Sequence, residues 1–192
     1  MPFTFYNSTI LPSLHVLETL THILTKASQH PNAATLPSAR LAPDMRPLSS
    51  QIHLAAQTIE RLLCRLNKTA HVPVEDTITS FEEMHARITS TRALLESVSE
   101  ASVNACADEV APTDLTRGMV SDMSGAGYAE GALANLYFHL NIAYAICRAQ
   151  GVPLGKPDYI MPFVKGHVGG VDLSGAVRER VDADAKKKEE SS

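Results

Sequence analysis

Three polar residues in one apolar segment near the C-terminus are the best candidates for chemistry. On a helical wheel His139 lies beside Leu136 and Ala143, so its imidazole faces the core, and Asn135 lies one turn earlier. Imidazole titrates closer to neutral pH than other side chains and can pass a proton to or from a substrate. With the hydroxyl of Tyr144, these residues predict a metal-free acid/base site in which Asn135 and Tyr144 orient the substrate.

The same residues also have a purely structural interpretation. A buried histidine is commonly satisfied by one hydrogen-bonding neighbour, and a tyrosine on a crowded helix is commonly a packing residue. The polar side chains would then form a network that fixes the register of the helices, and the protein would be a non-catalytic binding or assembly module. Loss of His139 would lower stability and abolish no reaction. The sequence leaves both hypotheses open.

The histidine pattern does not favour a metal site. A catalytic zinc ion usually takes three protein ligands and keeps one position open. One turn to either side of His139 stand Asn135 and Ala143, while His53 and His85 are solitary and are expected on the surface. We therefore predict no metal ligand and no cofactor. The chain also lacks the GxSxG, P-loop, GxGxxG and HExxH motifs of common hydrolases, nucleotide-binding proteins and zinc proteases.

Three charged residues in connecting segments are candidates for holding a ligand. Arg40 and Asp44 lie four positions apart in a proline-bounded linker, where a charge-assisted bond between them would fix the turn. Asp44 could instead cap the helix that follows. Lys156 lies in a glycine- and proline-rich arm, where its side chain could close over an anionic ligand or lie along the surface.

These residues must be positioned by helices, because apolar residues recur at three- and four-residue steps along most of the chain. Segments with this period cover residues 8–30, 52–66, 81–98 and 128–150. The third begins with a capping box formed either by Thr79 with Glu82 or by Ser80 with Glu83. We predict an all-α four-helix bundle, with either up-and-down topology or a long crossover.

Prolines and glycines interrupt the helical period in two places. Residues 101–131 are predicted to be a long connection before the last helix that could hold a short hairpin, and residues 107–131 are a candidate lid. Residues 152–164 are predicted to be an extended C-terminal arm packed over the bundle. We expect one helical domain over residues 1–164 and a poorly ordered charged tail over residues 165–192.

Composition restricts the partners and the location of the chain. Its 192 residues are 44% hydrophobic and 20% charged, with a formal charge of -4, so the basic excess needed for nucleic acid or acidic membranes is missing. Residues 131–147 form an uncharged stretch as long as any in the chain, and it is too short to span a bilayer. The first basic residue is Lys26, which argues against a secretory signal. We predict a cytoplasmic protein without nucleic-acid or membrane partners.

Three blocks of sequence carry a family resemblance. The first is Arg-Leu-Ala-Pro-Asp-Met from position 40, followed by Pro-Leu at 47 and by Gln51. The second covers residues 80–88, and the third extends from Asn-Leu-Tyr-Phe-His at 135–139 to Lys156. Over about residues 5–159 the chain resembles the family catalogued as domain of unknown function 1993, within the DinB-like superfamily.

The resemblance implies a DinB-like four-helix bundle and a homodimer. DinB-like bundles often bring three histidines together, two of them one turn apart on one helix, and this chain lacks that pair. Gln51 belongs to the first block and joins Arg40, Asp44 and Lys156 as a predicted substrate-binding residue. Two functions follow: a small-molecule-binding bundle performing isomerase, cyclase or lyase chemistry on a small apolar metabolite, or a non-catalytic homodimeric module.

The chain also departs from the family pattern. Ala134 stands where the family usually has proline, and Pro-Asp-Tyr at 157–159 replaces Arg-Asp-Phe. Residues 107–131 match poorly. If this connection shapes a pocket, we expect the ligand to differ from that of typical members.

Overall fold

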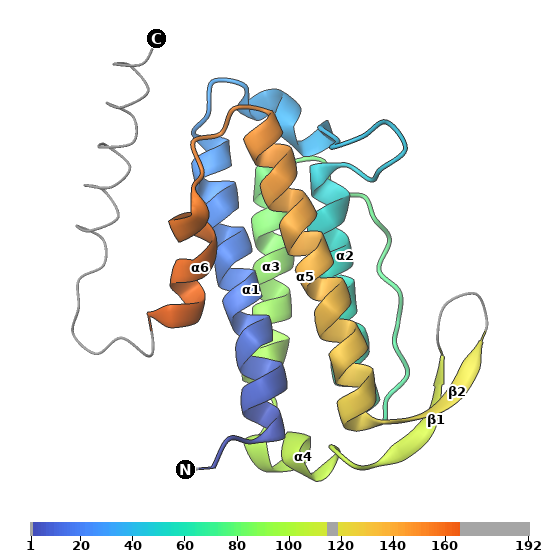
Figure 1. Cartoon of the computed structure of the whole chain (residues 1–192). Helices are drawn as coiled ribbons and strands as arrows, with labels where there is room; N and C mark the ends of the chain where they lie inside the picture. The colour runs from blue at the N-terminus through green and yellow to red at the C-terminus, as the bar shows by residue number, and fades with distance from the viewer. Residues whose placement is uncertain (1, 115–118, 166–192) are drawn as a thin grey trace.

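Four long helices form the body of the protein, as predicted. The structure is a computed structural model that describes residues 2–114 and 119–165. Its elements are α1 (Phe5–Ser28), η1 (Ala33–Ser38), α2 (Leu48–Asn67), α3 (Phe81–Glu96), α4 (Glu100–Ala105), β1 (Val110–Asp114), β2 (Val120–Ser124), α5 (Gly125–Ala149) and α6 (Lys156–Val164). The bundle consists of α1, α2, α3 and α5, and α4 with the two strands forms the connection that precedes α5 (Figure 1).

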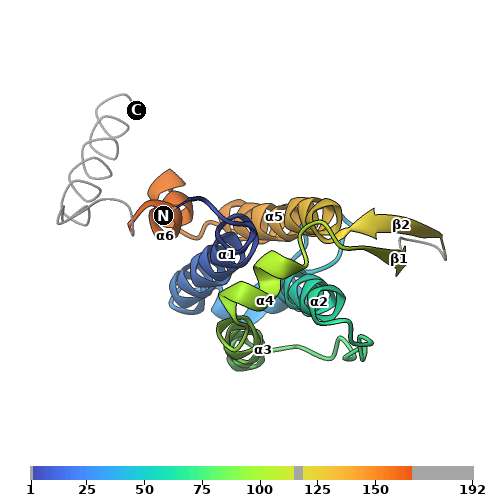
Figure 2. The ribbon, with the colours of Figure 1, turned by 90° about the horizontal axis from the view of Figure 1, so that it is seen from below.

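The bundle has a long crossover. Residues 68–80 run back along the outside of α2, so α2 and α3 point in the same direction and α1 and α5 point in the opposite one (Figure 1). Each helix packs against two others, α2 against α3 and α5, and α1 against α3 and α5, as the view along the bundle shows (Figure 2). Of the two topologies left open by the sequence, the structure has the crossover.

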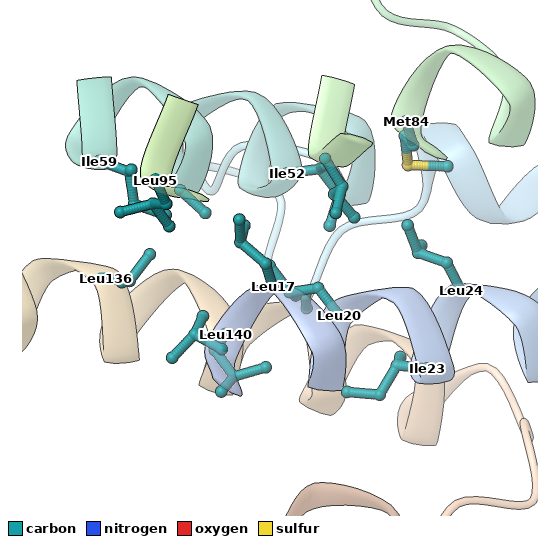
Figure 3. Packing of buried hydrophobic residues seen from close by; sticks show 14 of the residues in the cluster. Leu17, Leu20, Ile23, Leu24, Ile52, Ile59, Met84, Leu95, Leu136 and Leu140 are labelled. Atoms are coloured by element: carbon teal, nitrogen blue, oxygen red, sulfur yellow. The ribbon is translucent and has the colours of Figure 1, made fainter. Parts of the chain in front are cut away.

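The core lies between the four helices and is built from the predicted apolar stripes. Leu17 and Leu24 of α1, Ile59 of α2, Leu95 of α3 and Leu140 of α5 are all buried (Figure 3). The predicted capping box at the start of α3 is confirmed for one of the two pairs, Ser80 with Glu83. Local capping and apolar periodicity therefore account for the bundle helices.

The predicted extended arm is instead the helix α6 over most of its length. The Asp158 carboxylate accepts the Gly155 backbone N–H at 2.6 Å and so caps this helix. The same carboxylate binds His22 at 2.7 Å and Lys26 at 3.0 Å, both on α1. Burial alone would raise the pKa of Asp158, but the hydrogen bonds from His22, Gly155 and Lys26 together lower it. Pro157 lies in the first turn of α6, where a proline is compatible with a helix, whereas Pro162 lies inside the helix.

The connection before α5 contains a hairpin, as the sequence allowed. β1 pairs with β2 in antiparallel register, from Val110 opposite Ser124 to Asp114 opposite Val120. Arg65 of α2 donates hydrogen bonds to the carbonyl oxygens of Glu109 at 3.0 Å and Met123 at 2.8 Å, which ties the base of the hairpin to the bundle. Residues 125–131, which the lid prediction included, belong to α5.

Gly125 begins α5 at a point where the chain is too crowded for a side chain. A Cβ atom on this residue would lie 2.1 Å from the carbonyl oxygen of Cys106. The backbone N–H of Gly125 meanwhile donates to the carbonyl oxygen of Glu109 at 3.1 Å. Close backbone approach therefore requires glycine here.

Of the predicted charged tail, residues 165–192, only Lys165 lies within the described residues. The domain boundary at 164 therefore stays a prediction. None of the helices in the described part of the chain combines the length and the apolar character that crossing a bilayer requires.

Candidate functional site

The candidate site is a polar contact between α2 and α5. His139 of α5 is 8% exposed, and its Nδ1 lies 2.9 Å from Oε1 of Gln51, which is 3% exposed. The amide nitrogen of Gln51 donates to the carbonyl oxygen of Arg46 at 2.9 Å. These residues come from segments 88 positions apart in the chain. Two of the predicted site residues, His139 and Gln51, are thus brought together.

This contact determines which nitrogen of His139 carries the proton. A carbonyl oxygen such as that of Arg46 can only accept, so the amide nitrogen of Gln51 must face it and Oε1 must face the imidazole. Oε1 is also only an acceptor, and the hydrogen therefore resides on Nδ1. His139 is held as one neutral tautomer whose Nε2 has a free lone pair, and no hydrogen bond to Nε2 forms within residues 2–114 and 119–165.

Burial determines the charge state of the imidazole. Removal from water lowers the pKa of His139 from its ordinary value of 6.5 to about 4, because the charged form loses hydration. The side chain is therefore neutral near pH 7. A base with such a low pKa takes up protons weakly at neutral pH, but its free nitrogen can accept a hydrogen bond.

Asn135 makes a second polar link between the same two helices. Its amide nitrogen donates to Oγ1 of Thr58 at 2.8 Å, and the Thr58 hydroxyl donates to the carbonyl oxygen of Leu54 at 2.8 Å. Asn135 is exposed and has no hydrogen bond to His139 in the described part of the protein. This residue joins α5 to α2 beside the His139 contact.

Tyr144 lies on a different side of α5. Its ring packs edge-on against Tyr159 of α6, with ring centroids 5.9 Å apart. His139, in contrast, faces α2 through Gln51. The structure therefore does not bring Tyr144 to the imidazole, and the predicted trio of Asn135, His139 and Tyr144 is not assembled.

The charged candidates lie on the surface, away from this contact. Arg40 donates to the carbonyl oxygen of Met45, so the predicted bond to Asp44 was wrong. The predicted cap was also wrong, because a proline holds the N-cap position of α2 without a side-chain hydrogen bond. Lys156 is exposed at the start of α6 and forms no ion pair among the described residues. Of the four predicted substrate-binding residues, only Gln51 reaches His139.

The side chains here do not fit a three-histidine metal site of the kind associated with DinB-like bundles. His139 is the sole imidazole in the contact, and its Nδ1 is already engaged by an amide oxygen. The amide nitrogen of Asn135 is bound to a hydroxyl. In residues 2–114 and 119–165 no group of three or more His, Cys, Asp or Glu side chains is placed to hold a metal ion. We therefore derive no chemistry through a metal.

A second polar cluster, which the sequence analysis missed, lies between α2, α3 and the crossover. His53, expected on the surface, is only 3% exposed. Arg87 of α3 binds both oxygens of the Glu60 carboxylate, with Nη2 2.8 Å from Oε2. Ser50 donates to Asp76 of the crossover at 2.6 Å. The available signal was the spacing of Ser50, His53 and Glu60, which places three polar groups along one stripe of α2.

The fold defines a class, the DinB-like four-helix bundles. The structure is similar to the crystal structure of a DinB family member protein from Shewanella denitrificans, with a TM-score of 0.72 and 31% sequence identity. The similarity covers 81% of this chain and 90% of that one. The predicted resemblance to the superfamily is confirmed.

Within this class, the chain belongs to the family described as domain of unknown function (DUF1993), whose model matches residues 5–160. The match includes both polar clusters and most of α6. Comparison with curated protein sequences gave no match.

Proposed function

We propose that this protein is a non-catalytic helical binding and assembly module, in which the His139–Gln51 pair sets the register of α5 against α2. The observation that carries the proposal is the closed hydrogen-bond chain from Nδ1 of His139 through the Gln51 amide to the carbonyl of Arg46. Both polar atoms of the Gln51 side chain are hydrogen-bonded, Oε1 to His139 and the amide nitrogen to the carbonyl of Arg46. Such a satisfied buried pair favours one alignment of two helices, because a shift would leave polar groups unpaired.

The proposed assembly is a homodimer formed through the hairpin. Val110, Met119 and Val120 are 62%, 58% and 60% exposed, so the hairpin presents apolar side chains to solvent. It projects from one end of the bundle (Figures 1 and 2), and within the described residues β1 and β2 pair only with each other. Strand edges of this kind pair readily with another chain. β1 contains Pro112, which lacks an N–H, so we propose β2 as the strand that a second copy pairs with.

Sedimentation analysis tests the assembly. The unaltered protein should sediment at twice the monomer mass, and Val120→Lys should sediment as a monomer because the lysine charge would enter the interface. Val72→Lys is the matched control, since Val72 is 79% exposed in the crossover and should leave the dimer unchanged. A monomeric unaltered protein, or equal dissociation of both variants, would contradict the proposal.

A second candidate function is favoured by the free lone pair on Nε2 of His139. A neutral imidazole held in one tautomer could accept a proton from a small apolar metabolite, as in an isomerase, cyclase or lyase. The low pKa of this imidazole, about 4, weighs against strong base catalysis and is why we rank this candidate second.

Two substitutions of His139 separate the candidates. Asparagine places its amide nitrogen where Nδ1 stands and can still donate to Gln51, whereas glutamine places its amide near Nε2. If the residue is structural, His139→Asn should unfold at higher urea concentration than His139→Gln. If it is catalytic, both variants should lose turnover of the metabolite alike while remaining folded.

A further inference from the structure

An open groove lies on the outside of the bundle between α2, α3 and the crossover. Its volume is about 390 Å³. Apolar side chains of Val74, Ile78 and Ala86 form much of its wall, and His53 of α2 and Arg87 of α3 also line it. The groove is separate from the contact between α2 and α5, because it opens on the side of α2 that faces α3.

Unpartnered nitrogen atoms gather in this region. In the described part of the chain, the buried side-chain nitrogen and oxygen atoms without a hydrogen bond are Nδ1 of His53, Nε2 of His71 and Nε of Arg87. All belong to the same polar cluster: Arg87 binds Glu60, Nε2 of His71 lies 3.7 Å from that carboxylate, and the charges of Arg87 and Glu60 act on His53. Buried polar groups are nearly always paired in folded proteins. The nitrogen atoms themselves are buried, but His53 and Arg87 both line the groove, so a partner would reach them from the groove after a small shift of its wall.

The chemistry of the two lining residues indicates the group that would pair with them. The Nε–H of Arg87 is always a donor, so it requires an acceptor. His53 is buried, and this burial lowers its pKa, so the ring is neutral near pH 7. A neutral imidazole has one N–H, which on Nδ1 would be a second donor beside the Nε–H of Arg87. An oxygen atom with two lone pairs could accept from both.

The charges around the groove favour an uncharged ligand. The guanidinium charge of Arg87 is already balanced by its two bonds to Glu60. Glu75 and Glu83 also line the groove, and their carboxylates oppose an anion. A cationic group would leave the donor of Arg87 without an acceptor.

We propose that this groove is a binding site for a small uncharged molecule that places a carbonyl oxygen against Arg87 and His53 and a short apolar chain against Val74, Ile78 and Ala86. Amides and ketones have this chemistry. The site goes beyond the proposed assembly function, because it involves neither His139 nor the hairpin.

Three probes with the same apolar chain test the ligand class: pentanamide, pentanoate and pentylamine. Each is titrated into the full-length protein while the ring C–H signals of the histidines are followed by NMR. Pentanamide should shift the His53 signals in a saturable manner and bind at least about fivefold more tightly than either charged probe, as expected for a buried donor that gains a neutral acceptor.

The matched variants are His53→Leu and His85→Leu. His53→Leu should weaken pentanamide binding about five- to tenfold, the equivalent of one lost hydrogen bond. His85→Leu, which alters a half-buried histidine outside the groove, should bind as the unaltered protein does. If His53→Leu does not fold, the ranking of the three probes on the unaltered protein decides. Absence of saturable shifts with pentanamide, tighter binding of a charged probe, or equal loss in both variants would overturn the proposal.

Discussion

Replacement of Gln51 by leucine should destabilise the protein by about 1–3 kcal/mol. The change removes the acceptor for Nδ1–H of His139, and that imidazole is 8% exposed, so water can replace the lost bond only poorly. His139→Leu should have a similar cost, because it leaves Oε1 of Gln51 without its donor. Leucine is close in volume to both residues, so the effect of either change arises mainly from the unpaired polar group.

The double variant provides the decisive value. With leucine at both positions no polar group is left unpaired between the helices, and Arg46, whose carbonyl loses a donor, is an exposed residue that can bind water. The double variant should therefore be at least about 1 kcal/mol more stable than the sum of the single effects predicts.

Urea unfolding followed by far-UV circular dichroism measures these free energies, provided that the slope of the transition is the same for all variants. Asp44→Leu, at an exposed position without a hydrogen bond in the described residues, serves as the control and should change stability by less than about 0.5 kcal/mol. Additive single and double effects would refute the coupling of Gln51 and His139, and with it the proposed role of the pair.

Three further predictions concern pH, backbone crowding and the hairpin. The folded pKa of His139, about 4, lies below its ordinary value of 6.5, so the unfolded chain takes up the proton first as pH falls. The contribution of His139 to stability is fully present above about pH 6.5. Between about pH 7 and pH 5, urea titrations should record a loss of stability that is about 2 kcal/mol larger in the unaltered protein than in His139→Leu. Gly125→Ala should lower stability by about 1–3 kcal/mol because of the contact with Cys106, whereas Gly131→Ala, with open space around the new Cβ, should raise it by about 0.5–1 kcal/mol in thermal melts. Arg65→Met should speed amide hydrogen exchange in β1 and β2 and leave exchange in α1 unchanged, because it removes the bonds that tie the hairpin to α2.

Local signals accounted for the bundle helices, whereas contacts between distant segments depended on the tertiary structure. The cap of α3 could be predicted because Ser80 and Glu83 are three residues apart and bond to each other's backbone. The helix α6 was missed although Asp158 caps it locally, from three residues after Gly155; only the contacts of this carboxylate with His22 and Lys26 of α1 depend on the tertiary structure. Prolines in this segment permit either an extended chain or a helix.

The candidate site shows the same division. The inward position of His139 followed from its helical spacing beside Leu136, and its burial is confirmed. The burial of His53 could not be inferred, because it depends on the crossover that covers this side of α2. The same crossover creates the groove.

The sequence by itself determined the helical class and the apolar stripes, which depend on residue types repeated at three- and four-residue steps, and the family, whose resemblance rests on three blocks of motif residues. Only the tertiary structure decided that His139 pairs with Gln51, that Tyr144 turns toward α6, and that His53 lies beside Arg87. The physical reason is that contacts between helices depend on the rotation and axial shift of one helix relative to another. Those quantities are set by the packing of the whole core and not by the neighbours of any one residue.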